Sequence, residues 1–202
     1  LIRESSINKC WEESMRYFLL NAHSRILCGK EYMILDDFTM EADHYIREKQ
    51  ISSYCPWLQK SCDFNLSQLD SPSKFSEIGR IYSYSSKNIN QYEYAVKVLK
   101  KRKNIKPIVL SIYDPCKDSR DHVPTPCINN ITLDLYDGFV NMQVNYSTMN
   151  IFRMGLFDFH QMALLHERFA IDSDYKVGRL RINSTQLHMP VFDYAVSKEI
   201  FG

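Results

Sequence analysis

The sequence predicts an α+β fold in a single domain that spans residues 1–202. The pattern around residues 130–146 is that of a β-hairpin, whereas residues 7–24 and 90–103 carry apolar side chains at helical spacing. Separate helical and extended segments are typical of this class. With 202 residues, of which 45% are hydrophobic, the chain is long enough to bury a sizeable core.

The first predicted helix covers residues 7–24. Ser6 can cap its start, and Trp11 and Met15 fall on one apolar face. Cys28-Gly29 is predicted to end the helix, because glycine is common just after a helix.

Extended segments follow this helix. Residues 32–35 and 38–40 predict a strand or a hairpin. From residue 55 to residue 76 the pattern is weak: Pro56, Trp57 and Leu58 can start a short helix, and residues 65–73 look like loop.

The second predicted helix covers residues 90–103 and ends in the basic run Lys100 to Lys103. Cations suit the negative end of the helix dipole, so a solvated basic helix end is the simplest interpretation. The alternative is attraction of an anionic ligand. Residues 108–113 are mostly apolar and predict a buried strand.

The predicted hairpin has strands at residues 130–136 and 139–146, joined by the favoured two-residue turn Asp137-Gly138. Cys127 lies just before the first strand and directly after a proline. A cysteine held rigidly at a strand edge can be a nucleophile if its thiolate is stabilised. The alternative is a small buried apolar residue.

Charge and hydropathy exclude several classes of partner. Lysine plus arginine (25) nearly balances aspartate plus glutamate (24), so no strong field favours nucleic acid or an anionic membrane. No apolar run reaches the roughly 18–20 residues that span a bilayer, and we see no signal peptide. The six cysteines form no CxxC pair and are expected to be free thiols. We therefore expect a cytoplasmic protein.

Histidines in the predicted helix at residues 157–170 raise the question of a metal site. His160 and His166 are six positions apart and do not share a helical face as an i, i+4 pair does. We expect no metal.

Six landmarks run through the C-terminal part of the chain in one order and without a gap. They are Pro126-Cys127, Asp137-Gly138, Tyr146 to Asn150, the segment Phe157 to Ala170, Val177-Gly178 and His188. In this order they resemble thymidylate synthase and its pyrimidine hydroxymethylase relatives, most closely the short, archaeal-type members. The resemblance implies a mixed, bent sheet with a long helix packed across it, and a homodimer formed through the sheets.

The resemblance also implies a covalent reaction. In this family a cysteine thiolate adds to C6 of a pyrimidine, and C5 then attacks the methylene carbon of 5,10-methylenetetrahydrofolate. Cys127 matches the nucleophile. Tyr84 matches a tyrosine that reaches the reacting base, with Tyr82 as the alternative, although Ser85 replaces the glycine that usually follows. An aromatic strand packed on the core is the competing interpretation.

Asp158 matches the family's base-reading position, where the synthases have an asparagine that recognises uracil. A carboxyl group accepts from the exocyclic amine of cytosine and, when protonated, donates to its N3. The same replacement marks the cytidylate hydroxymethylase branch, so Asp158 favours a cytosine-type base. The alternative is an aspartate that only stabilises the first turn of its helix.

The family's phosphate-binding groups are depleted. Ser147 replaces an arginine that forks onto phosphate, and Lys106-Pro107 replaces two arginines that cross the dimer interface. Each charge-assisted contact typically contributes about 1.5–3 kcal/mol, so a nucleoside 5′-monophosphate should bind weakly unless Lys106, Arg153 or Arg25 substitutes. A nucleoside, a free base or a differently substituted pyrimidine is then plausible.

The remaining matched positions concern sugar and cofactor. Thr148 keeps a hydroxyl, and His188 matches a histidine that reaches the ribose, whereas Pro190 replaces the tyrosine beside it. Asn150 replaces an aspartate that contacts the folate pterin, and it carries no charge. Gln143 is a further candidate on the hairpin.

Two hypotheses follow. The first is a folate-dependent C5 hydroxymethyl- or methyltransferase that acts on a cytosine-type nucleoside or nucleotide. Attack by water would give a hydroxymethyl product, and transfer of a hydride would give a methyl product. The second is a catalytically degenerate or repurposed homologue that binds a ligand, forms a dimer or acts on a non-nucleotide substrate.

Overall fold

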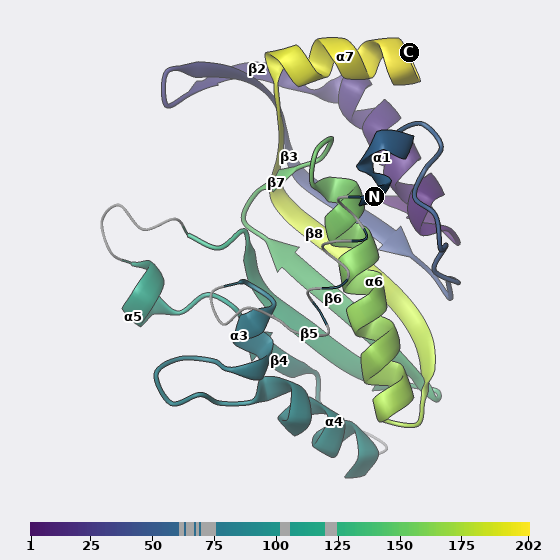
Figure 1. Ribbon diagram of the computed structural model, residues 1–202, viewed down its shortest axis with the longest axis vertical. Coiled ribbons are helices and arrows are strands. Elements are labelled where there is room, and N and C mark those ends of the chain that lie inside the picture. Colours follow the sequence, from purple (N-terminus) through teal and green to yellow (C-terminus); the bar gives the residue numbers. More distant parts are fainter. Residues whose placement is uncertain (61–62, 64–66, 68, 70–75, 102–105, 120–124) are drawn as a thin grey trace.

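The computed structural model describes residues 1–60, 63, 67, 69, 76–101, 106–119 and 125–202. Within these residues a mixed β-sheet forms one layer, and α1 (Ile7–Asn21) and α6 (Gly155–Asp172) lie over one of its faces (Figure 1). This arrangement confirms the predicted α+β class. In the described residues, no helix combines the length and the apolar character needed to cross a membrane.

The sheet has eight strands in the described part of the chain. They are β1 (Ile2–Glu4), β2 (His23–Leu27), β3 (Lys30–Ala42), β4 (Ile108–Ser111), β5 (Ile128–Tyr136), β6 (Phe139–Tyr146), β7 (Met149–Asn150) and β8 (Lys176–Pro190). The order is β1-β3-β8-β6-β5-β4, while β2 pairs with β3 and β7 with β8. The pairs β1/β3, β6/β8 and β7/β8 are parallel, and the others are antiparallel.

The structure also describes further helical segments around this core. They are η1 (Pro56–Leu58), α3 (Gly79–Tyr82), α4 (Gln91–Lys101), α5 (Pro115–Asp118) and α7 (Val191–Phe201). Most residues of α6 are buried, because this helix packs against β6 and β8 on one side and against α1 on another. A helix that is covered on several sides can be apolar around most of its circumference.

The β5–β6 hairpin has the predicted turn. Asp137 and Gly138 both have positive φ (50° and 79°), as a two-residue turn of the primed type requires. Along β6 the even-numbered residues from Val140 to Tyr146 are buried under the helices, and the odd-numbered residues face the other side. Tyr146, at the end of the strand, therefore points to the helical layer.

The opposite face of the sheet is polar. The side-chain amide of Asn145 donates to Asn130 at 2.8 Å, and that of Asn183 donates to Asn145 at 2.9 Å. On the same face Glu41 is fully buried, with Arg3 and Arg181 within 2.7 Å of its carboxylate. Hydrogen bonds and ion pairs thus satisfy side chains that no described helix covers.

The first helix is shorter than predicted. Helix α1 ends at Asn21, and β2 follows almost at once. Cys28 and Gly29 both have positive φ (49° and 75°) and form the turn between β2 and β3, so their prediction as the end of the helix was wrong. A positive-φ pair serves a hairpin turn as well as a helix end, and the sequence alone did not separate the two.

The two extended segments predicted between residues 32 and 40 form one continuous strand, β3, so the strand is confirmed over the alternative of a hairpin. Other elements differ from the predictions. Tyr82 ends the short helix α3 instead of lying in a strand, and its ring stacks on Tyr92 at 5.2 Å. The predicted helix end at residues 102–103 lies outside the described residues. Helix α7 was not anticipated.

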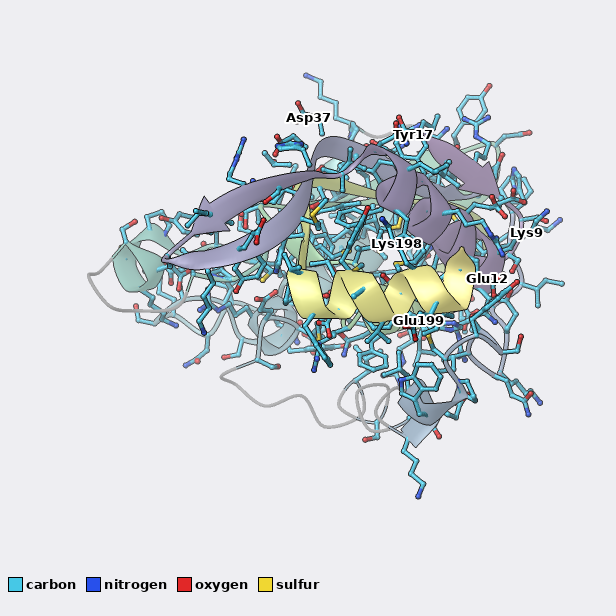
Figure 2. All side chains as sticks on the ribbon, turned by 90° about the horizontal axis from the view of Figure 1, so that it is seen from above. Lys9, Glu12, Tyr17, Asp37, Lys198 and Glu199 are labelled. Carbon is cyan, nitrogen blue, oxygen red and sulfur yellow. The ribbon has the colours of Figure 1, made fainter. Side chains whose placement is uncertain are left out.

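Contacts between α1, α7 and the turn before α6 position the start of α6. The indole N–H of Trp11 donates to the carbonyl oxygen of Ile151 at 2.8 Å, and its ring meets Phe201 edge-on at 5.5 Å. Arg153 forms two hydrogen bonds with Asp193, at 2.6 and 2.7 Å. Seen from above, α7 crosses this end of the molecule next to α1 (Figure 2). These contacts tie the turn before α6 to two other helices.

We predict that Gly178→Ala is strongly destabilising. A Cβ atom at this position would lie 2.4 Å from Oδ1 of Asn141 and 2.7 Å from the backbone oxygen of Val140, beside the register shift between β6 and β8. Overpacking of this kind typically costs about 1–3 kcal/mol. Urea unfolding should show the loss as a lower midpoint.

Gly155→Ala is the matched control. A Cβ atom there meets its nearest neighbours at 3.5–3.6 Å, which is ordinary contact, and alanine favours a helix by about 1 kcal/mol over glycine. Equal midpoints for the two variants would contradict the packing described for Gly178.

Candidate functional site

A cavity of about 440 Å³ lies where the β5–β6 hairpin, β7 and β8 meet the first turns of α6. Its size is within the range of about 300–1,000 Å³ that is usual for small-molecule sites. Ile128, Met149 and Met154 contribute apolar walls. The hydroxyl, carboxyl, thiol, aromatic and imidazole side chains around it are those of Ser76, Glu77, Cys127, Tyr146, Thr148, Asp158 and His188.

Cys127 and Asp158 line this same cavity, although they come from different elements. Cys127 precedes β5 and is exposed, while Asp158 lies in the first turn of α6. The carbonyl oxygen of Cys127 accepts from the backbone N–H of Ser147 at 2.8 Å and from its hydroxyl at 3.2 Å. The hairpin therefore holds the cysteine backbone at its open end, opposite the helix that carries the aspartate.

Glu77 holds the same backbone from the other side. Its carboxylate accepts from the backbone N–H of Cys127 at 2.7 Å and from that of Ile128 at 3.1 Å. Sequence reasoning missed Glu77, because it directly follows a stretch whose helical and strand pattern is weak. Only the tertiary fold brings it to the cysteine.

The electrostatics of the cavity are acidic. Burial, and next the charge of Glu77, raise the pKa of Asp158 to about 7. Burial, Glu77 and Asp158 together raise the pKa of the Cys127 thiol to about 11. In the described residues, no lysine or arginine lines the cavity. At neutral pH the thiol is therefore protonated, and Asp158 is protonated in part of the molecules.

Thr148 and His188 form a pair at the cavity wall. The hydroxyl of Thr148 lies 2.8 Å from Nδ1 of His188, and the ring of Tyr32 meets the imidazole edge-on at 5.8 Å. Burial lowers the pKa of His188, so the imidazole is neutral at neutral pH. The two residues that the sequence analysis linked to the sugar thus lie together.

Asn150 also lines the cavity, where the resemblance would place a folate contact. Its side-chain oxygen accepts from the backbone N–H of Arg153 at 2.9 Å, which leaves its amide NH2 group for a ligand. A neutral donor can bond to a pterin, but it does not supply the negative charge that a carboxylate would. The residues present therefore fit a reduced folate only in part.

Four candidate residues do not line the cavity, namely Tyr84, Gln143, Lys106 and Ser147. The hydroxyl of Tyr84 donates to the carbonyl oxygen of Tyr113 at 2.9 Å, beside α5. Gln143 points to the opposite face of the sheet, where its amide lies 3.3 Å from Asn145. Lys106 is exposed just before β4. The side chain of Ser147, as described above, bonds to the Cys127 backbone.

The arginines considered as substitutes for phosphate contacts are paired elsewhere. Arg153 binds Asp193 through two hydrogen bonds, and Arg25 on β2 lies 3.7 Å from Asp36. Pro190 ends β8 and precedes the first residue of α7.

The two histidines of α6 have structural partners. Nε2 of His160 lies 2.8 Å from Asn8, and Nε2 of His166 lies 2.7 Å from the carbonyl oxygen of Val140. Burial lowers the pKa of each to about 4. Among the described residues, no group of three or more His, Cys, Asp or Glu side chains could hold a metal ion.

Sequence reasoning also passed over Tyr146 and Gln161 as lining residues. Strand alternation carries the signal for Tyr146, because it continues the buried series of β6. Helical spacing carries the signal for Gln161, which is three positions after Asp158 on α6.

We predict that the free energy of unfolding depends on pH through Asp158. An aspartate has a pKa of about 3.9 in an unfolded chain, whereas Asp158 has a pKa of about 7 in the folded protein. Folding therefore favours the protonated form, and the stability that this provides is lost as the pH rises from about 4 to about 7. Asp158→Asn removes this pH dependence. The free energy of unfolding of the variant minus that of the original protein should therefore increase by about 2–4 kcal/mol from pH 4 to pH 8.

Urea unfolding at several pH values measures this difference, and contributions from the histidines cancel because both proteins contain them. Asp118→Asn is the control: hydrogen bonds from Arg80 lower the pKa of Asp118, so above about pH 5 its carboxylate is ionised in both the folded and the unfolded state, and the effect of this substitution on stability should not change with pH there. A constant difference between Asp158→Asn and the original protein would contradict the prediction.

Comparison with models of known protein families finds no match for this chain, and no curated protein is significantly similar to it. The resemblance drawn from the landmark residues therefore remains a proposal.

Proposed function

We propose that the chain is a thymidylate synthase-like one-carbon transferase that acts at C5 of a cytosine-type pyrimidine nucleoside or nucleotide through a covalent adduct with Cys127. The observation that carries this proposal is that Cys127 and Asp158 line one cavity of suitable size. The mixed sheet crossed by α6 agrees with the resemblance. The expected cytoplasmic location stays a prediction.

Asp158 is the residue that would read the base. No described residue hydrogen-bonds to its carboxyl group, and its pKa of about 7 keeps a protonated form available. A protonated carboxyl group donates to the unprotonated N3 of cytosine and accepts from its exocyclic amine. Uracil, with a carbonyl oxygen and an N–H at these positions, would present the opposite pattern.

The acidic lining favours a nucleoside over a nucleotide. Glu77 and Asp158 would repel a phosphate group, and no cationic side chain among the described residues lines the cavity to offset this repulsion. Thr148 and His188 instead offer neutral hydrogen-bonding groups, which suit the hydroxyls of a ribose.

The covalent step needs a base, because the Cys127 thiol is protonated at neutral pH. As the sulfur bonds to C6, the S–H proton passes to a carboxylate, and we assign this role to Glu77 at the cysteine backbone. The electrons of the C5–C6 double bond then make C5 nucleophilic. When C5 then gives its proton to water, the electrons of that C–H bond restore the double bond, the sulfur leaves as a thiolate, and the thiolate regains its proton from Glu77.

When bound, a reduced folate such as 5,10-methylenetetrahydrofolate would supply the one-carbon unit. Asn150 is the residue that would hold it. The product is hydroxymethyl if water completes the transfer and methyl if a hydride does.

We also propose a homodimer formed through the polar face of the sheet. The ladder of Asn130, Asn145 and Asn183 crosses the centre of this face, and no described helix covers it (Figure 1). Gln143→Lys would place a charge there and should shift the chain from dimer to monomer in sedimentation velocity. A monomeric original protein at micromolar concentration would contradict the proposal.

The reaction predicts exchange of the C5 hydrogen without any cofactor. Cytidine tritiated at C5 should release tritium to water in the presence of the protein, because addition of sulfur at C6 activates C5. Cys127→Ser should reduce release to the uncatalysed rate. Cys116→Ser, which alters an exposed thiol outside the cavity, should leave release unchanged.

Asp158→Asn should transfer the exchange from cytidine to uridine, since an amide donates and accepts at the positions that uracil requires. If the original protein releases no tritium from cytidine, CMP or dCMP, the transferase proposal fails.

The second candidate function is a degenerate or repurposed homologue that binds a ligand without the covalent step. The raised pKa of Cys127 favours it, because reactive cysteines usually have a lowered pKa and a nearby cation. In this candidate the cavity and Asp158 bind the ligand, and Cys127 lines the cavity without reacting.

Alkylation of Cys127 by iodoacetamide tests the electrostatic basis of this second candidate. In Glu77→Gln one negative charge is removed, so the pKa of Cys127 should fall and its alkylation at pH 7 should accelerate by about tenfold for each pKa unit. Mass spectrometry of the peptides measures the rate, with Cys116 as the internal reference. An unchanged rate would show that Glu77 does not restrain the thiol.

A further inference from the structure

The hydroxyl of Tyr146 has no hydrogen-bond partner in the described part of the chain. The residue is 2% exposed, and its hydroxyl oxygen is fully covered. Buried tyrosine hydroxyls normally find a partner, and one without a partner destabilises the folded protein. An unpaired buried group of this kind needs an explanation.

Other tyrosines of this protein show the usual situation. The hydroxyl of Tyr45 lies 3.2 Å from the carbonyl oxygen of Ala163 and 3.0 Å from Nδ1 of His166. The hydroxyl of Tyr194 donates to the carbonyl oxygen of Leu19 at 2.8 Å. Tyr146 differs from these in that it lines the cavity.

The surroundings of Tyr146 are those of the proposed reaction. Tyr146 pairs with Ile128 in the β5–β6 ladder, and Ile128 directly follows Cys127 in the sequence. Burial, and then the charges of Asp158, Glu77 and Cys127, raise the pKa of its phenol. The hydroxyl is therefore neutral at neutral pH, and it can both donate and accept a hydrogen bond.

We propose that Tyr146 is a ligand-binding residue, whose hydroxyl bonds to the exocyclic group at C4 of the pyrimidine that Asp158 reads. This inference rests on the proposed cytosine-type ligand. An amphoteric hydroxyl accepts from an amine and donates to a carbonyl oxygen. Tyr146 therefore contributes affinity for cytosine and uracil alike, while Asp158 decides between them.

Contact with the ligand requires the side chains that cover the hydroxyl to move. Met149 and Met154 line the same cavity, and unbranched methionine side chains change their conformation readily. The unpaired hydroxyl makes the protein less stable without the ligand and is satisfied when the ligand binds.

The test compares Tyr146→Phe with Tyr45→Phe by thermal unfolding and by calorimetric titration with cytidine and uridine. Tyr146→Phe removes an unpaired hydroxyl, so its melting temperature should rise by about 2–6 °C. Its Kd for both nucleosides should increase by about tenfold, with their ratio unchanged. Tyr45→Phe should lower the melting temperature and leave both Kd values unchanged, because it removes a paired hydroxyl outside the cavity.

Asp158→Asn completes the design, since it should invert the ratio of the two Kd values. If cytidine binds the original protein and Tyr146→Phe equally well, the role of Tyr146 is overturned and the proposed function stands. A melting temperature of Tyr146→Phe below that of the original protein also overturns it, because the hydroxyl would then have a structural partner. If cytidine does not bind the original protein, both proposals fail together.

Discussion

The burial of α6 between the sheet and α1 is the constraint on which the candidate site depends. Because most of this helix is covered, its rotation and its position along the sheet are set by packing. The hydrogen bond from Trp11 to Ile151 and the pairing of Arg153 with Asp193 hold the turn from which the helix starts. Asp158, in the first turn, is consequently held over the open end of the β5–β6 hairpin.

The site combines a thiol with two carboxyl groups, and this combination determines what it can bind. Glu77 holds the backbone of Cys127 through hydrogen bonds, but its negative charge also raises the pKa of the Cys127 thiol. The same residue therefore positions the cysteine and disfavours its thiolate form. Asp158 shares the same low-dielectric environment and is partly protonated for the same reason. Such a cavity suits a neutral ring that offers both a donor and an acceptor, and it disfavours an anion.

The two faces of the sheet differ in how they satisfy polar groups. On the face with α6 and α1, packing covers apolar side chains, and the polar groups of the cavity gather at one end. On the other face, an amide ladder and the ion pairs of Glu41 form a network that needs no helix above it. Polar groups that are already paired with one another can meet a second polar surface at little desolvation cost, which supports the proposed dimer.

The sequence by itself determined the local elements that short-range rules govern. The Asp137-Gly138 turn follows from a positive-φ preference, and the register of β5 with β6 follows from the alternation of apolar side chains. Asp158 was expected early in a helix, and α6 indeed begins at Gly155. The same local rules did not decide whether Cys28-Gly29 ends a helix or turns a hairpin, because both uses need positive φ.

Only the tertiary structure decided which side chains meet. Cys127 and Asp158 reach one cavity because a hairpin and a helix pack together, whereas Tyr84 and Gln143 are directed elsewhere by α3 and by the pleat of β6. Glu77 carries no sequence signal, since its role comes from two backbone N–H groups far along the chain. Shifts in pKa likewise depend on burial and on neighbouring charges, which are properties of the folded chain and not of its residues taken in order.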